Sequence, residues 1–278
     1  MPTPLRHKVP TFPEDGRPTV AELHRAFNRL ERAGWLCMQI AEQRLDAETV
    51  LPIWAYASGG QAERVVLAGI HGREPAGVVA LARYVDRLLD LGAERPILVL
   101  PLLNPWGYRH HERYGPSGQS VSDSDHWLGR ATAPACPEAE AITDFMMNHA
   151  HLAAGAAVLD LHEDPIYEAS GYAFEGRGSY YYAIGDGAGQ HPITQRVGAY
   201  LRNSALPLVL EGQTRFGETL EQGLIVDSED GSIDELLARK RGCSPVLTTE
   251  LVLKGEQDPP LAARVDVYLG LLDAFFGD

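Results

Sequence analysis

The chain has 278 residues, 45% of them apolar, with a formal net charge of −14 at pH 7 and a pI near 5.1. This length allows one substantial core, and the acidic balance disfavours nucleic acid or an anionic membrane as partner, because the field repels phosphates. Cys37, Cys136 and Cys243 lie far apart without CxxC spacing, which indicates neither a disulfide framework nor a thiolate zinc site. No run approaches the ~20 apolar residues of a membrane span and the N-terminus shows no apolar signal core, so we expect a soluble, cytoplasmic protein.

The first half of the chain alternates between predicted helices and strands. Thr19 and Glu22 form a TxxE capping box ahead of apolar residues at helical spacing, which predicts a first helix. A second helix is predicted to begin at Pro75 and to continue through Leu88. Residues 104–132 carry Gly, Pro, Ser and many charges without a sustained period, which predicts a long loop. Apolar runs predict strands over 36–40, 50–56, 65–70 and 97–103.

The second half continues the same alternation. Pro137 opens a predicted helix that runs to His149. We predict strands over 156–161, near Leu208 and over 245–250, and helices over 192–203, 232–239 and about 265–276, with a Tyr- and Gly-rich segment over 163–189 and an irregular stretch over 212–231. No repeat or low-complexity linker divides the chain. The alternation predicts a single α/β domain over residues 1–278, with an extended lead over about 1–18 and a mostly parallel mixed, twisted sheet covered by helices on both faces.

Polar side chains stand where three apolar strands end. His71 and Glu74 follow one strand, His162 follows another, and Glu250 ends the last. Ligands of such sheets bind beyond the carboxyl ends of parallel strands. Two imidazoles and one carboxylate are the protein ligands of a hydrolytic zinc site, and a further glutamate can act as its general base. HxxE alone occurs often by chance, and a single histidine is commonly a surface or core residue. The shared position at strand ends is what favours a site.

Five short motifs follow one another along residues 65–275. They are HGRE at 71–74, NPWGY at 104–108, PEAEA at 137–141, DLH at 160–162 and TTE at 248–250. This ordered set resembles the zinc carboxypeptidase family, which includes the aspartoacylase and succinylglutamate desuccinylase acylases. The resemblance implies that His71, Glu74 and His162 hold one Zn²⁺ per chain. It also implies that Glu250 is the general base that activates water and later protonates the leaving amine, a role that suits a buried glutamate with a raised pKa.

Two further residues are candidates beside this set. Arg113, in HERY, resembles the RY arginine of the acylase branch, which stabilises the tetrahedral oxyanion; the alternative is a solvated loop arginine. Asp160 shares a strand face with His162 at period two, so it either orients a ligand imidazole or serves as a structural carboxylate. The tyrosine of the family's active site matches no local motif, and the candidates are Tyr167, Tyr172, Tyr180, Tyr181 and Tyr182.

One stretch departs from the family's pattern. Members that bind a substrate carboxylate carry an Asn-Arg pair, and VSDSDHW at 121–127 places Ser124 and Asp125 there, followed by His126. We take these three as candidate substrate-binding residues. An aspartate repels a carboxylate, so three alternatives are open. The substrate presents an amine or a neutral end, the stretch does not correspond to that motif, or another arginine supplies the charge, such as Arg130, Arg177 or Arg215.

The sequence therefore predicts a zinc-dependent hydrolase of amide bonds. Its substrate is a peptide in a carboxypeptidase-like reaction or, alternatively, an N-acyl amino acid. A third interpretation, a non-catalytic zinc-binding relative, is favoured by the missing Asn-Arg pair. It is opposed by the presence of His71, Glu74, His162 and Glu250, since a binding protein has no need of a base beside zinc. No GxSxG elbow supports a serine hydrolase, and no GxxxxGK[ST] loop supports phosphate binding.

Overall fold

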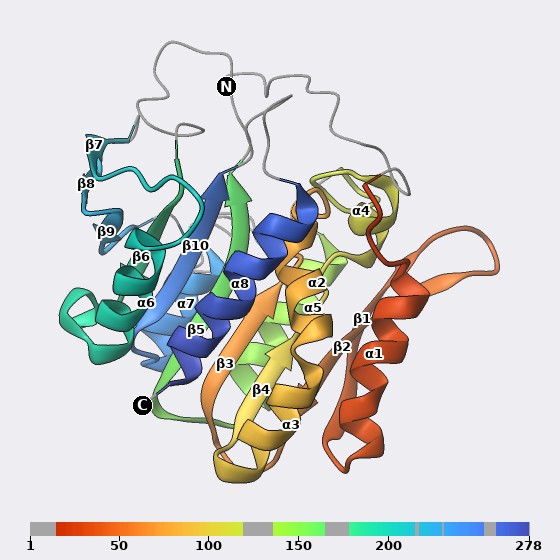
Figure 1. Cartoon of the computed structure of the whole chain (residues 1–278). Coiled ribbons are helices and arrows are strands. Elements are labelled where there is room, and N and C mark those ends of the chain that lie inside the picture. The colour runs from red at the N-terminus through yellow and green to blue at the C-terminus, as the bar shows by residue number, and fades with distance from the viewer. Residues whose placement is uncertain are drawn as a thin grey trace.

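The computed structural model describes residues 15–118, 136–164, 178–214, 217–229, 231–252 and 260–277. Its described strands form one ten-stranded sheet in the order β1-β2-β4-β3-β5-β10-β6-β9-β8-β7 (Figure 1). The strands are β1 (Leu36–Arg44), β2 (Val50–Ala57), β3 (Ala62–Ala68), β4 (Ile97–Leu100), β5 (Leu152–Asp164), β6 (Tyr180–Ile184), β7 (Glu211–Gln213), β8 (Thr219–Glu221), β9 (Leu224–Val226) and β10 (Val246–Val252). The α-helices are α1 (Val20–Arg32), α2 (Pro75–Arg83), α3 (Val85–Glu94), α4 (Pro105–His110), α5 (Pro137–Asp144), α6 (Pro192–Arg202), α7 (Ile233–Arg241) and α8 (Leu261–Phe276).

The centre of the sheet is parallel and its flanks are largely antiparallel. Strands β4, β3, β5 and β10 pair in parallel, whereas β1, β2 and β4 pair antiparallel on one side. On the other side β10 pairs antiparallel with β6, and β6 pairs in parallel with β9. The predicted α/β class with a mixed sheet is confirmed. Because β3, β5 and β10 run the same way, their carboxyl ends meet at one edge (Figure 1).

Helices cover both faces of the sheet, as predicted. Alternate residues of β3 show this plainly: Val66 and Ala68 belong to one buried cluster, and Val65 and Leu67 belong to another. The first cluster includes residues of α1, α2, α3, α6 and α8, and the second includes residues of α5 and α7. Figure 1 shows α1, α2, α3 and α8 on one side of the strands.

Most predicted elements are present, with shifted ends. The capping box of α1 forms, because the Thr19 side chain accepts from the Glu22 backbone while Glu22 accepts from the Thr19 backbone. The helix predicted from Pro75 through Leu88 is divided into α2 and α3 at Tyr84. The hydroxyl of Tyr84 donates to Asp273 at 2.6 Å, so a tertiary contact with α8 accompanies the break. The helix predicted from Pro137 to His149 ends in a π-helical turn over Phe145–His149.

Three segments were wrongly predicted to be irregular. The predicted loop over 104–132 contains α4, whose N-terminal cap is the Asn104 side chain accepting from Gly107. The predicted segment 163–189 contains β6, and the stretch 212–231 contains β8 and β9 with part of β7. The strand predicted near Leu208 is a single bridge to Ser179. Strands β7, β8 and β9 are too short to show a period, and β6 depends on the partners β9 and β10, which are distant in the chain.

Helix α2 packs closely against the sheet and thereby positions the turn that carries His71 and Glu74. Its residues from Pro75 to Leu81 are all buried. A Cβ atom on Gly77 would lie 2.7 Å from the Cβ atom of Leu161, so only glycine allows this approach to β5. The close contact brings the start of α2, and the turn before it, beside the end of β5.

No described helix combines the length and the apolar character needed to cross a lipid bilayer.

Candidate active site

The turn between β3 and α2 carries His71 and Glu74. Both side chains are buried, and the Glu74 backbone N–H donates to the His71 carbonyl at 3.1 Å. The first turn of α4, which follows β4, lies directly against the turn between β3 and α2. A Cβ atom on Gly72 would lie 1.9 Å from the carbonyl carbon of Gly107, so the two backbones cross in contact. Glycine at position 72 therefore fixes where the two potential ligands lie.

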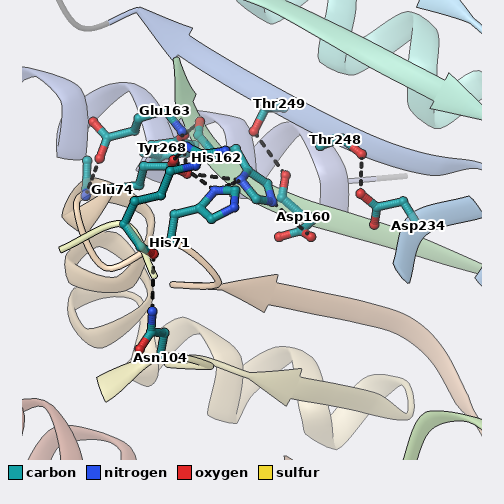
Figure 2. Close-up of polar contacts among 12 residues, drawn as sticks. His71, Glu74, Asn104, Asp160, His162, Glu163, Asp234, Thr248, Thr249 and Tyr268 are labelled. Atoms are coloured by element: carbon teal, nitrogen blue, oxygen red, sulfur yellow. Dashed lines mark hydrogen bonds and ion pairs between the residues drawn. The ribbon is translucent and has the colours of Figure 1, made fainter. Parts of the chain in front are cut away.

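Three donor side chains converge on one point at the carboxyl ends of β3 and β5 (Figure 2). The Nδ1 atom of His71 lies 2.9 Å from Oε1 of Glu74, and Nδ1 of His162 lies 3.0 Å from Oε2 of Glu74. The two Nδ1 atoms are 3.1 Å apart. Ligands of a tetrahedral zinc ion, each about 2.0–2.1 Å from the metal, are about 3.3 Å from one another. The spacing and the chemistry of this donor set therefore fit a divalent metal ion.

Asp160 holds the ring of His162 from the opposite side. Its Oδ2 atom lies 3.2 Å from Nε2 of His162, and its side chain is fully buried on the same face of β5. A carboxylate at Nε2 places the proton there, so that the lone pair of Nδ1 faces Glu74 and His71. Three electron-rich atoms then face one another, an arrangement that a cation or a proton must neutralise.

The electrostatics of the two histidines differ although they touch. Burial, with help from Arg113, lowers the pKa of His71 to about 4 against the opposing pull of Glu74. Burial also lowers the pKa of His162, but Asp160 and Glu74 outweigh it, so the pKa of His162 lies well above its ordinary value. Glu74 has a pKa well below its ordinary value because the two histidines outweigh its burial. These directions favour His162 over His71 as the group that carries a neutralising proton when no metal is bound.

Further groups hold Glu74 in place. Nη1 of Arg113 donates to Oε1 of Glu74 at 2.9 Å, and the Glu163 backbone N–H donates to Oε2 at 3.2 Å. The Arg113 side chain is 29% exposed, so it is only partly enclosed by the protein. Both oxygens of Glu74 are thus oriented from outside the donor cluster, which is the usual support of a metal ligand.

Glu250 lies in the strand beside His162. In the parallel pairing of β10 with β5, Glu250 is opposite His162, and directly opposed residues point to the same face. Burial, together with Glu74 and Asp164, raises the pKa of Glu250 well above its ordinary value, although His162 and Arg113 pull it down. A carboxyl group with a raised pKa next to a metal pocket suits proton transfer near neutral pH.

The structure thus brings together six of the residues predicted for the site. His71, Glu74 and His162 form the donor cluster, and Asp160, Arg113 and Glu250 surround it. The candidate substrate-binding residues Ser124, Asp125 and His126 lie outside the described residues, as do Arg130, Arg177, Arg215, Tyr167 and Tyr172.

The three remaining candidate tyrosines lie in β6 instead of a loop. Tyr180 is opposite Glu250 in the antiparallel pairing with β10. Tyr181 is buried. Its hydroxyl interacts with Arg202 in α6 through a hydrogen bond and through the positive charge of the arginine.

Several supporting residues were not predicted. Tyr268 in α8 donates its hydroxyl proton to the carbonyl of His162, and the Thr249 hydroxyl donates to the carbonyl of Asp160 at 3.2 Å. The Glu163 side chain accepts from the backbone of Ala76 at 2.9 Å and lies 3.0 Å from Arg264. Glu163 has a sequence signal, because it is an acid directly after the DLH motif. A tyrosine inside an amphipathic helix has none.

A model of the succinylglutamate desuccinylase/aspartoacylase catalytic domain matches residues 61–214, more than half of the chain. The chain belongs to this family. The residues matched to the succinylglutamate desuccinylase/aspartoacylase family include His71, Glu74, Arg113 and His162, whereas Glu250 follows them. The family is part of the zinc carboxypeptidase-like superfamily, and its His-Glu-His metal-binding triad is the donor cluster described above. None of the curated proteins compared matches the chain.

Solved structures show the same fold at low identity. A candidate metallopeptidase from Shewanella baltica OS155 has a TM-score of 0.70 and 20% identity, covering 91% of this chain and 90% of its own. A metallo-carboxypeptidase from Pseudomonas aeruginosa, in complex with (2-guanidinoethylmercapto)succinic acid, has a TM-score of 0.58 and 16% identity, covering 91% and 67%. Bovine thrombin-activatable fibrinolysis inhibitor, in complex with tick carboxypeptidase inhibitor, has a TM-score of 0.61 and 14% identity, covering 94% and 97%. The succinylglutamate desuccinylase/aspartoacylase domain of this chain therefore has a carboxypeptidase-like fold.

Proposed function

We propose that the protein is a zinc-dependent hydrolase that cleaves an amide bond, with Glu250 as its general base. The observation that supports this most strongly is the convergence of His71, Glu74 and His162, with their donor atoms 2.9–3.1 Å apart, beside Glu250 in the adjacent strand. A bound zinc ion lowers the pKa of a water molecule from about 16 to about 7 and polarises a carbonyl group.

The residues around the pocket supply the remaining steps. Glu250, whose surroundings raise its pKa, takes a proton from water and returns it to the leaving nitrogen. Arg113, whose side chain is partly exposed, presents a permanent positive charge beside Glu74, where it stabilises negative charge that develops on the substrate oxygen. Asp160 keeps the proton of His162 on Nε2, away from the pocket.

The family favours an N-acyl amino acid as substrate, since its described members remove an acyl group from an amino acid. A peptide is the second candidate, favoured by the likeness to a candidate metallopeptidase and to a metallo-carboxypeptidase. Zinc-loaded protein assayed against N-acyl amino acids and against peptides with free C-termini separates the two. Chelation should remove all hydrolysis and zinc should restore it. Zinc-loaded protein that cleaves no amide in either set would refute the proposal.

Asp160→Asn should weaken zinc binding about 10- to 100-fold while preserving the shape of the side chain. The amide lacks the charge that keeps the Nε2–H tautomer of His162 and that makes Nδ1 a stronger donor. Asp234→Asn is the matched control, because Asp234 is equally buried in the neighbouring region but accepts from the Thr248 hydroxyl, at 2.6 Å. Competition with a chromophoric chelator measures both affinities. Equal losses in the two variants would contradict a role for Asp160 at the metal.

Zinc affinity should rise with pH, by about tenfold per unit, until the pH reaches the raised pKa of His162. When no metal is bound, the raised pKa keeps this imidazole protonated at pH values above its ordinary pKa of 6.5, so zinc must displace one proton. The protonated form stabilises the metal-free chain below about pH 6.5, and that contribution is lost as the pH rises through the folded-state pKa. Calorimetry in two buffers of different ionisation enthalpy should count about one proton released. An affinity independent of pH between about 5.5 and 7 would contradict this assignment.

A further inference from the structure

A chain of buried amide hydrogen bonds joins strand β1 to the segment that carries Arg113. The backbone N–H of Trp106 donates to Oε1 of Gln43 at 2.8 Å, and Nε2 of Gln43 donates to Oδ1 of Asn104 at 3.0 Å. Nδ2 of Asn104 then donates to the carbonyl oxygen of Arg113 at 3.2 Å. Gln43 is 1% exposed and Asn104 is 0% exposed, so water does not compete for these contacts.

Backbone groups fix the orientation of both amides. The N–H of Trp106 can only donate, so the oxygen of Gln43 must face it and the NH₂ group must face Asn104. The backbone N–H of Gly107 also donates to Oδ1 of Asn104, at 2.9 Å, which leaves the NH₂ group of Asn104 for the Arg113 carbonyl. Each amide has one role in the chain, and neither can be reversed without losing a buried bond.

The same carbonyl is tied to the metal-ligand turn. The backbone N–H of Gly72, between His71 and Glu74, donates to the Arg113 oxygen at 3.2 Å. The side chain of Arg113 reaches the Glu74 carboxylate at 2.9 Å. Arg113 is therefore held at its backbone by Asn104 and Gly72, and its guanidinium lies where that backbone places it. Figure 2 shows Asn104 with its amide directed toward the turn of His71 and Glu74.

We propose that Gln43 and Asn104 are positioning residues that set the guanidinium of Arg113 against Glu74 and the reacting carbonyl. This inference rests on the proposed function, because it gives Arg113 its task there. Pairing of β1 with β2 uses only backbone groups, so it does not require a buried glutamine at position 43. A buried amide is costly without partners, and here the backbone N–H groups of α4 fix the two amides so that their remaining donor reaches the carbonyl of Arg113. Gln43 also lies before residues 61–214, outside the part matched by the family model.

Two variants break the chain at different bonds. Gln43→Leu keeps the volume of the side chain and removes both of its hydrogen bonds. Asn104→Asp keeps the acceptor for Gly107 and Gln43 but sets a carboxylate oxygen against the Arg113 carbonyl, which repels it. We expect kcat to fall about 10- to 100-fold in each, with KM changed less than about threefold and zinc content unchanged. Ser58→Ala is the control, because it removes two comparable bonds, with Ile97 and Arg95, at the far end of β4.

A double-mutant cycle with Arg113→Ala distinguishes positioning from mere stability. If Gln43 acts through Arg113, Gln43→Leu should lower kcat/KM in the wild-type background and have almost no effect once Arg113 is alanine. Equal fold-losses in both backgrounds would overturn the proposal.

Crystal structures of the wild type and Asn104→Asp give a second readout that needs no substrate. We expect the wild type to keep the Arg113–Glu74 contact and the variant to lose it. A guanidinium in the same place in both structures would overturn this inference. Failure of the zinc-loaded wild type to hydrolyse any substrate would instead refute the proposed function and would leave the structural test valid.

Discussion

Glu250→Gln should lower kcat by about 10²- to 10⁴-fold while the protein keeps its full complement of zinc. Glutamine has nearly the same shape but cannot take a proton from water. Glu250 lies opposite His162 in the adjacent strand and is not one of the three converging donors, so the metal should stay bound. Steady-state kinetics of the zinc-loaded variant, together with metal analysis of the same preparation, make the measurement.

Glu138→Gln provides the matched control for this substitution. Glu138 is a buried carboxylate at the start of α5 and is not one of the three converging donors. We expect its activity to stay within about twofold of wild type. Retained hydrolysis in Glu250→Gln would remove Glu250 from the mechanism, whereas retained zinc with no turnover would exclude a merely structural role.

Gly72→Ala should destabilise the protein by about 3 kcal/mol and weaken zinc binding at the same time. The added methyl group would lie 1.9 Å from the carbonyl carbon of Gly107 and 2.2 Å from the backbone nitrogen of Tyr108. Both are backbone atoms, so no side-chain rotation relieves the clash and the two turns must separate. His71 and Glu74 move with their turn, which disperses the donor atoms. Thermal unfolding with and without zinc measures both effects, and we expect Tm to fall by about 5–10 °C.

Gly189→Ala is the control that tests whether the losses of stability and zinc affinity are specific to position 72. There the new methyl group would meet Val226 at 3.0 Å, but only at the end of a side chain. We expect a loss below about 1 kcal/mol and unchanged zinc affinity. A Gly72→Ala protein as stable as this control, with full zinc affinity, would show that the crossing of the two turns is not required.

The parts of the fold that position the metal ligands could be predicted from the sequence. Strands β3, β5 and β10 are buried on both faces over most of their length and are rich in apolar residues, and the residues that carry the chemistry lie at or just beyond their carboxyl-terminal ends. Parallel pairing then brings His71, His162 and Glu250 to one edge. Local rules were sufficient here because strand ends and helix caps are marked by neighbours in the chain.

The antiparallel flank could not be predicted in the same way. Strands β7, β8 and β9 are three residues each, too short for a clear apolar pattern, and the strand that joins them to the sheet, β6, pairs with β9 and β10, which are distant in sequence. The break between α2 and α3 likewise coincides with a contact from Tyr84 to Asp273, nearly two hundred residues away.

The sequence by itself determined which side chains could bind a metal and that parallel strands would carry them to a common edge. Only the tertiary structure decided how they are held: the backbone crossing of Gly72 and Gly107, the support of His162 by Asp160, and the amide chain from Gln43 to Arg113. The physical reason is the separation in sequence between the residues that interact. Apolar periodicity reports the burial of a residue within its own element, whereas a hydrogen bond between residues 61 positions apart, such as that of Gln43 with Asn104, exists only after both elements have packed.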